Sequence, residues 1–312
     1  MIFKQFISVW MAVKSILIGC PFPNEVCESC PDRLYEINMV GKLPDQVKES
    51  SGLAAHNDLF FTHSDSGGPA VLYAFKDGED LKGEIAIPGV KNVDWEDLAQ
   101  DNDGHVFIGD IGNNLNGRKD LTIYRYNIFS SDVEVINYHY EDQRDFPPKK
   151  NKDKRFDCEG MFWARGHLYL IAKIRGGKQV KIYQLPDRAG SYEAKVVQEF
   201  KMKLQVTGAD ISPDGRQVVL LSYGKVLMYK TFFEEDNTIQ LVPVYCKRFL
   251  NSGQSEGVLF LDEERLLITN EKGKVFLMER RVPIEQQPEE LKERPIVAPP
   301  IVPKEQINNT DR

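Results

Sequence analysis

Five short strings in the sequence repeat one pattern, and four of them carry an oxygen ligand at the same position. The strings are SSGLA from residue 50, WEDLA from 95, CEGMF from 158, GADIS from 208 and SEGVL from 255. Aligned on the apolar residue in their fourth position, they place five residues in one column: Ser51, Glu96, Glu159, Ala209 and Glu256. Because oxygen-only ligands are typical of hard cations, the column predicts one calcium ion bound by its serine and three glutamates.

Three carboxylates that converge on one point repel one another. At about 4 Å each pair costs on the order of 1 kcal/mol in water and about 4 kcal/mol at an effective dielectric constant of 20. Protons, arginines or a metal ion can offset this repulsion. The alternative to a metal site is that these acids form hydrogen bonds to neighbouring strands and bind no ion.

The spacing of the column indicates the fold that must position it. Steps of 45, 63, 50 and 47 residues separate its members, and repeats of this length built from strands are typical of β-propellers. After WEDLA come a turn at 101–104 and three segments rich in Val, Ile, Tyr and Phe: HVFIGD, LTIYRYN and VEVINYHYE. The sequence therefore predicts an all-β fold with four strands in each repeat.

The ends of the repeats predict how the ring closes. The fifth repeat supplies three strands, while an unassigned strand, RLYEINMVGKL, begins at residue 33. We expect a five-bladed β-propeller whose N-terminal strand completes the last blade, which removes an open sheet edge. Six blades are the alternative, because the 63-residue step is long; we interpret its charged segment 141–156, which contains two prolines, as a mobile loop.

In a propeller, the loops that precede the inner strands and those that follow the second strands open on the same face. This topology brings further polar residues to the calcium site, namely His63, Asp65, Asp110, Arg118, Lys173, Asn270 and Glu271. Asp65 or Asp110 could orient or deprotonate a water molecule, and Arg118 and Lys173 could stabilise a developing negative charge. A structural role is the alternative for Asp110 and Arg118, since Asp110 precedes the turn-forming GNN sequence and Arg118 could brace that loop.

Residues 65–69, DSGGP, resemble the nucleophile loop of trypsin-like proteases. Such an enzyme needs its histidine and aspartate well upstream, and only about 65 residues precede Ser66. The glycines lie between FFTHS and AVLYAF, the second and third strands of the first repeat, where a hairpin turn requires positive φ angles. We therefore interpret this motif as a turn.

The order Ser, Glu, Glu, small residue, Glu at five inner strands resembles the calcium-activated nucleotidases (apyrases), which are five-bladed propellers with a central calcium. The likeness spans residues 50–270, and Ala209 departs from it, with Thr207 or Asp210 as the nearest substitutes. The strings DWED, GDIGNN and VTGADISPDG are similar to those of uncharacterised exported bacterial propellers. These resemblances imply calcium as cofactor and leave the activity open.

Two functions follow from this site. One is calcium-dependent hydrolysis of a phosphate ester or anhydride, nucleotidase-like or phytase-like, acting on a small anionic substrate drawn by the basic segment 149–155. The alternative is a non-catalytic propeller that binds a surface glycan, peptide or protein with structural calcium. Trp95 and Trp163 could stack on sugars, although core packing is the simpler role for both.

Composition and termini complete the expectations. The 312 residues carry a formal net charge of −7, which argues against nucleic-acid binding. Residues 1–20 resemble a bacterial lipoprotein signal ending in LIGC, so that Cys20 would be lipidated; an ordinary disordered N-terminus is the alternative, because Lys14 interrupts the apolar stretch. We expect a linker at 21–32, the propeller at 33–282, a disordered proline-rich tail at 283–312, and an exported monomer held at the cell envelope only by its lipid.

Overall fold

The protein has an all-β, β-propeller-like fold. The computed structural model describes residues 21–22, 34–76, 80–150, 153–173 and 179–281, and these contain twenty strands and no α-helix. No helix within these ranges is long and apolar enough to cross a membrane. The predicted signal, Cys20 and the proline-rich tail lie outside the described residues.

The strands form five groups of four, which correspond to the five sequence repeats. Group one contains β2 (Ser50–His56), β3 (Leu59–Ser64), β4 (Val71–Lys76) and β5 (Asp80–Ala86). Group two contains β6 (Trp95–Gln100), β7 (His105–Asp110), β8 (Leu121–Asn127) and β9 (Val133–Tyr140). Group three contains β10 (Asp157–Ala164), β11 (His167–Lys173), β12 (Gln179–Pro186) and β13 (Gly190–Lys201). Group four contains β14 (Val206–Ile211), β15 (Gln217–Ser222), β16 (Lys225–Phe233) and β17 (Ile239–Arg248).

Group five combines the two ends of the described chain. It contains β18 (Ser255–Phe260), β19 (Arg265–Asn270), β20 (Lys274–Arg280) and β1 (Tyr35–Lys42), and β1 pairs antiparallel with β20. This pairing agrees with the closure predicted from the unassigned N-terminal strand, and it protects the outer edge of β20.

Groups two and three join into one eight-stranded sheet through a parallel pairing of their outermost strands, β9 and β13. The segment between these groups, 141–156, adds no strand in its described part, 141–150 and 153–156. The long step in the repeat is therefore a connection between groups two and three.

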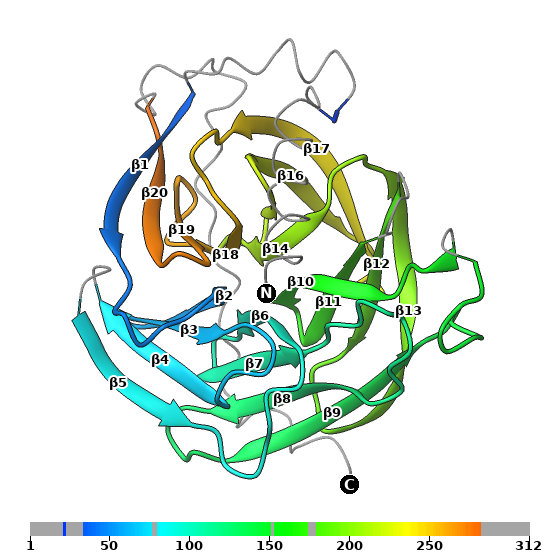
Figure 1. The fold of residues 1–312 in the computed structure, drawn as a ribbon. Coiled ribbons are helices and arrows are strands. Elements are labelled where there is room, and N and C mark those ends of the chain that lie inside the picture. Colours follow the sequence, from blue (N-terminus) through cyan, green and yellow to red (C-terminus); the bar gives the residue numbers. More distant parts are fainter. Residues whose placement is uncertain (1–20, 23–33, 77–79, 151–152, 174–178, 282–312) are drawn as a thin grey trace, which may run out of the picture.

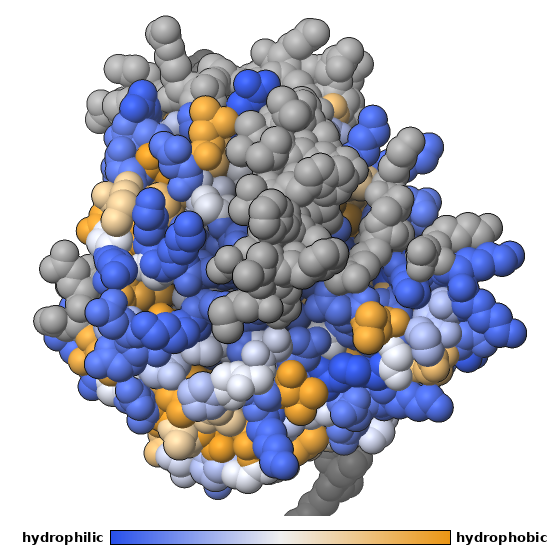
Figure 2. Space-filling model, in the orientation of Figure 1, coloured by the Kyte–Doolittle hydropathy of each residue, from blue (hydrophilic) through white to orange (hydrophobic). Residues whose placement is uncertain are grey.

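The innermost strands β2, β6, β10, β14 and β18 contact one another in a closed order, and we call them the hub. Figure 1 shows them around the centre of the molecule, with the third and fourth strands of each group outside. Hydrophobic side chains fill each of the five interfaces between neighbouring groups. Because strand side chains alternate, Met161 packs toward group two and the next residue, Phe162, toward group four. Figure 2 shows a mostly hydrophilic surface with scattered apolar residues.

The hub strands approach closely because small residues line one level of them. A Cβ atom on Gly208 would lie 2.2 Å from the carbonyl oxygen of Glu256, and one on Gly52 would lie 2.7 Å from the backbone nitrogen of Leu98. Group two has Asp97 at the equivalent position instead of glycine. Its buried carboxylate accepts hydrogen bonds from the backbone of all three strands β6, β10 and β14.

Candidate metal centre at one end of the hub

Irregular pairing at the start of the inner strands sets the direction of the column residues. In β6, Trp95 pairs with Asp110 and Asp97 with Gly109, so Glu96 has no residue opposite and forms a β-bulge. Glu159 and Glu256 occupy the same bulge in β10 and β18. A bulge re-aims its side chain, which explains how three glutamates from different strands turn toward one end of the hub.

In β14 the bulge lies at Thr207, between Val206 and Gly208 in the pairing. The structural equivalent of the glutamates is therefore Thr207, two residues before Ala209, where the string alignment placed it. The strings VTG and CEG align in this register. The alignment failed here because it used Ile211 as the apolar residue of the fourth position, whereas Ala209 occupies that position in the structure.

The two hydroxyl residues of the column hold neighbouring hub strands together. Ser51 Oγ donates to the carbonyl oxygen of Glu96 at 2.6 Å, and Thr207 Oγ1 donates to that of Ser255 at 2.7 Å. The hydroxyl of Ser51, a predicted calcium ligand, thus donates its hydrogen bond to the backbone of β6. The column divides into hydroxyls that connect strands and carboxylates that gather at the end of the hub.

Seven carboxylates gather at this end, and we call them the acid cluster: Asp65, Asp94, Glu96, Asp157, Glu159, Glu256 and Glu271. Two sets of three within it could each hold a metal ion, because their ligand oxygens lie within 4.8 Å of one another. The first set is Asp65, Asp94 and Glu96, and the second is Asp65, Glu256 and Glu271. An oxygen–oxygen span of up to about 5 Å fits calcium, whose bonds to oxygen are about 2.3–2.6 Å, better than magnesium.

Burial and crowding raise the pKa values of these acids. Burial, followed by the nearby Glu159 and Asp65 carboxylates, raises the pKa of Glu96 well above its ordinary value. Burial, with Glu271 and Asp65 nearby, does the same to the pKa of Glu256. Burial and the Asp157 carboxylate raise the pKa of Asp94 to about 6. The cluster therefore favours protons or another source of positive charge.

Lys173 neutralises one side of the cluster. Its ammonium, on a side chain 10 % exposed, forms a very short ion pair with Glu159 and lies 3.4 Å from Asp157. Burial nevertheless raises the pKa of Glu159 to about 7, although Lys173 acts to lower it. Two of the sequence candidates, Lys173 and Glu159, are thus partners of each other.

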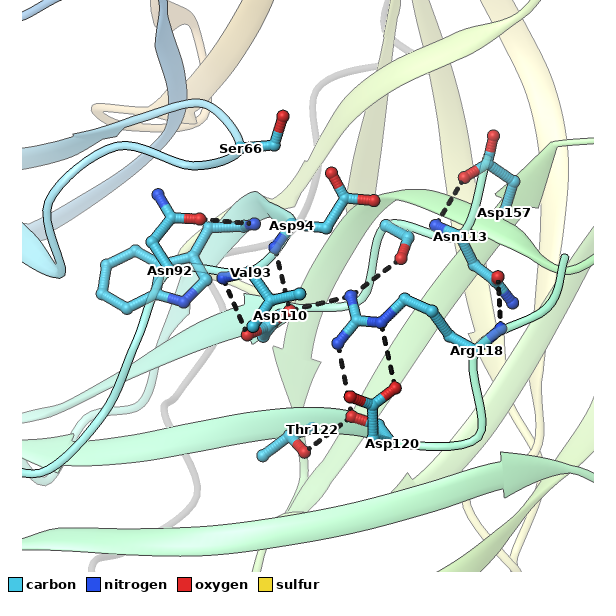
Figure 3. Close-up of polar contacts among 12 residues, drawn as sticks. Ser66, Asn92, Val93, Asp94, Asp110, Asn113, Arg118, Asp120, Thr122 and Asp157 are labelled. Carbon is cyan, nitrogen blue, oxygen red and sulfur yellow. Dashed lines mark hydrogen bonds and ion pairs between the residues drawn. The ribbon is translucent and has the colours of Figure 1, made fainter. Parts of the chain in front are cut away.

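Asp110 and Arg118 form a brace beneath the cluster (Figure 3). Asp110 is 1 % exposed and accepts hydrogen bonds from the backbone nitrogens of Val93 and Asp94, at 3.3 and 3.1 Å. The Arg118 guanidinium lies 2.8 Å from Asp110 and also contacts Asp120. Asp110 therefore contacts the loop that carries Asp94, and Arg118 is paired with Asp110.

The rest of the GDIGNN string holds the acids in place as well. The backbone nitrogen of Gly112 donates to the carbonyl oxygen of Asp94 at 3.0 Å, and that of Asn113 donates to the Asp157 carboxylate at 2.8 Å. A Cβ atom on Gly112 would lie 2.3 Å from Glu96 Oε1 and 2.4 Å from Asp94 Oδ2. Only glycine leaves these two carboxylates in their observed positions.

The DSGGP motif is a turn that presents Asp65. The Asp65 carboxylate accepts a hydrogen bond from the backbone nitrogen of Ser66 at 2.5 Å, and Gly67 has a φ of 74°. His63 is fully buried against Trp95, and burial lowers its pKa to about 4. A neutral histidine packed in the core supplies no base to Ser66, in agreement with the rejection of a protease.

Sequence reasoning missed three members of this site. Asp94 and Asp157 each precede a column glutamate by two residues, so a shared D-x-E spacing in DWED and DCEG was the available signal. The third is Tyr223, whose hydroxyl donates to Glu256 Oε1 at 2.9 Å. It follows β15, where Asp65, Asp110 and Glu271 follow or end the second strands of other groups.

Comparisons with known proteins show no family for this chain. No protein-family model matches it, and neither does any curated protein. Solved structures with a similar arrangement include the PQQ-bound aldose sugar dehydrogenase of Streptomyces coelicolor, with 10 % identity over 80 % of this chain and 99 % of that one and a TM-score of 0.47. The PQQ domain of pyranose dehydrogenase from Coprinopsis cinerea has 8 % identity over 81 % and 99 %, with a TM-score of 0.45. At these values the function must be argued from the residues of this chain.

Proposed function

We propose that this protein is a five-bladed β-propeller that binds calcium at the acid cluster and serves as a binding module. Five groups of four strands, each packed on two neighbours, support five blades rather than six. The observation that carries calcium binding is the buried Glu96, which is 8 % exposed. Its carboxylate has no hydrogen-bond or ion-pair partner among the described residues, and it points toward Asp65 and Asp94.

An unpartnered, buried carboxylate is unfavourable unless it is protonated or bound to a cation. The three carboxylates of this set, Asp65, Asp94 and Glu96, suit a hard divalent ion, and the missing side chain of Gly112 leaves room for two of them. The metal would also connect blade one, which carries Asp65, with blade two, which carries Asp94 and Glu96. This arrangement supports calcium as a structural ion beneath a docking surface for a glycan, peptide or protein.

Thermal unfolding of the full chain tests calcium binding. In the presence of a chelator the chain should unfold at a lower temperature, and calcium should raise the melting temperature more than magnesium does. Gly112→Ala should reduce the calcium effect, because the new methyl group displaces two ligands. Gly117→Ala is the matched control in the same loop, since its Cβ atom would meet nothing closer than 3.9 Å. Equal calcium effects in both variants would contradict the proposed ligands.

A second candidate function is hydrolysis of a phosphate ester or anhydride. The observation in its favour is Glu159, whose pKa near 7 suits a group that accepts and releases a proton. Against it, Arg118 and Lys173 are both engaged in ion pairs within the protein. Phosphate release from nucleotides, phytate and a generic phosphate ester, each with calcium and with chelator, separates the two functions. Calcium-dependent release that Asp110→Ala abolishes would favour the enzyme, and no release from any substrate favours the binding module.

We also propose export to the cell envelope, from the lipoprotein-like sequence that ends at Cys20. Extracellular calcium modules work with dissociation constants of about 0.1–1 mM, which a partly preorganised site of this kind can meet. Labelling with a radioactive fatty acid tests the lipid: the native chain should incorporate it and Cys20→Ala should not.

A further inference from the structure

We propose that the outer edge of groups three and four docks on an anionic lipid surface. This inference does not need the proposed calcium site, and it uses the proposed lipid at Cys20 only to explain how this edge is brought to a membrane. The docking surface consists of four basic side chains close to Phe22, which we call the basic rim: Lys201, Lys203, Lys247 and Arg248.

Phe22 fastens the start of the described chain to this edge. Its ring packs edge-to-face on Tyr229, with 5.3 Å between the ring centroids, and contacts the hydrophobic cluster between groups three and four. Figure 1 shows this short segment, in dark blue, on the outside of the molecule near β17. Because two residues span at most about 7 Å, a lipid on Cys20 would leave the chain within about that distance of Phe22. The lipid would therefore hold this edge of the propeller against the membrane.

Tyr229 also connects Phe22 with the first two members of the basic rim. Its ring centroid lies 5.7 Å from that of Phe200, and its hydroxyl donates to Met202 Sδ at 3.6 Å. Lys201 and Lys203 alternate with these two residues along the chain, and both lysine side chains are exposed. The end of β13 and the segment after it thus bury apolar side chains beside Tyr229 and present ammonium groups to the solvent.

The other two members of the basic rim lie on β17. Cys246 packs against the hydrophobic cluster that Phe22 contacts, and Lys247 and Arg248 follow it directly. The strands β13 and β17 lie side by side, since the Gln198 side chain forms hydrogen bonds of 2.8 and 3.1 Å with the backbone of Leu241. The four basic residues therefore border one contact surface, although they come from two groups.

The charge of the rim is opposite to that of the whole chain. The chain has a formal net charge of −7, whereas the rim gathers four positive charges. Lys201, Lys203 and Arg248 form no ion pair with a residue of the described ranges. Glu199, the nearest acid along β13, lies 3.9 Å from Lys181 instead. Three cationic groups of the rim are therefore available to negatively charged groups outside the protein.

A lipid surface fits these features better than another anionic partner. Leu250, two residues after Arg248, is 63 % exposed and could enter the boundary between headgroups and acyl chains. A single lipid chain binds a membrane weakly, and a basic surface next to it supplies the second contribution that stable anchoring requires. β13 and β17 are the outermost strands of their groups, so docking there leaves the acid cluster at the hub accessible.

Sedimentation with vesicles of equal parts phosphatidylglycerol and phosphatidylcholine tests the rim. The full chain carries Cys20→Ala and the buffer contains chelator, so that neither the lipid nor calcium contributes. We expect this chain to bind and to be released at about 1 M salt, where charges are screened beyond about 3 Å. Adding Lys201→Gln and Lys203→Gln should lower the partition coefficient about 25-fold, since each basic side chain near such a surface contributes about a fivefold factor. Adding Lys42→Gln and Lys76→Gln instead is the matched control, because it removes the same charge from exposed side chains of groups five and one, and it should leave binding unchanged.

The outcomes separate the rim from the other proposals. Equal losses in the rim and control variants would show that only the net charge matters, and would overturn the rim. Equal binding to vesicles of pure phosphatidylcholine, or no binding to the anionic vesicles, would overturn it as well. A chain that binds no calcium can still pass this test, because the vesicle assay is performed in chelator. Likewise, a chain that incorporates no fatty acid would refute the lipid at Cys20 and leave the vesicle result to decide the rim.

Discussion

Replacement of Asp97 by alanine tests how the hub is held together. The Asp97 carboxylate is fully buried and accepts three backbone hydrogen bonds, from Leu98 at 2.9 Å, Met161 at 2.8 Å and Ala209 at 3.1 Å. Alanine fits the site, because the native aspartate already has a Cβ atom there, but it leaves three N–H groups without an acceptor. At about 1–3 kcal/mol for each unsatisfied group, the loss is roughly 3–9 kcal/mol.

The lower part of that range is the expected result. Burial raises the pKa of Asp97 well above its ordinary value despite the three donors, so the carboxylate itself is unfavourable in the hub and its removal recovers part of the loss. Because a domain of this kind is stable by about 5–15 kcal/mol, a loss near 3 kcal/mol is readily measured.

Urea unfolding at pH 7 in chelator is the appropriate assay, since it excludes any contribution from metal. Asp97→Ala should lower the midpoint with little change in the slope, and Asp97→Asn, which keeps one acceptor oxygen, should lie between it and the native chain. Asp58→Ala, at an exposed ion pair, should change stability by less than about 0.5 kcal/mol. An Asp97→Ala protein within about 1 kcal/mol of the native chain would refute the role of this carboxylate.

Three further predictions concern the charges of the cluster. In chelator, the melting temperature should fall between pH 5 and pH 8, because the raised pKa values of Asp94 and Glu159 make the folded chain hold protons that the unfolded chain releases. The stabilisation by calcium should grow over the same pH range. A melting temperature that rises with pH in chelator would contradict this prediction. Lys173→Met leaves Asp157 and Glu159 without their counter-charge and should lower the stability of the metal-free chain by about 3–5 kcal/mol in urea unfolding, with no change as the contrary result. Asp110→Asn loosens the loop that carries Asp94 and should weaken calcium binding about 10–100-fold in a titration, whereas a catalytic role for Asp110 predicts unchanged calcium affinity with loss of phosphate release.

Much of the fold follows from the sequence because the repeat is visible in it. The recurring strings mark the starts of β2, β6, β10 and β18, and the unassigned strand near residue 33 pairs with the last one. The fourth repeat was misaligned because a β-bulge, which depends on pairing with a second strand, determines which residue turns inward. The sequence of one strand does not show how that strand pairs with its neighbour, so Ala209 was aligned where Thr207 belongs.

The site was only partly predictable, because its acids are sorted by partners distant in the sequence. Three glutamates at equivalent positions, Glu96, Glu159 and Glu256, predict a cation site with oxygen ligands. Glu159 differs from the other two because it forms an ion pair with Lys173. That difference comes from where β11 ends, which no spacing within one string reveals. In the same way, the hydrogen bond from Asn113 to Asp157 crosses 44 residues, so the contact of the GDIGNN loop with an acid of the cluster could not be predicted from either string alone.

Calorimetric titration of calcium into the metal-free full chain tests the central claim most directly. We predict a saturable heat that is lost in Asp65→Asn, together with about 3 kcal/mol of added stability when free calcium exceeds the dissociation constant 100-fold. The absence of any binding heat up to several millimolar calcium, with an unchanged melting temperature, would contradict the claim that buried acids at the end of the hub form a metal centre.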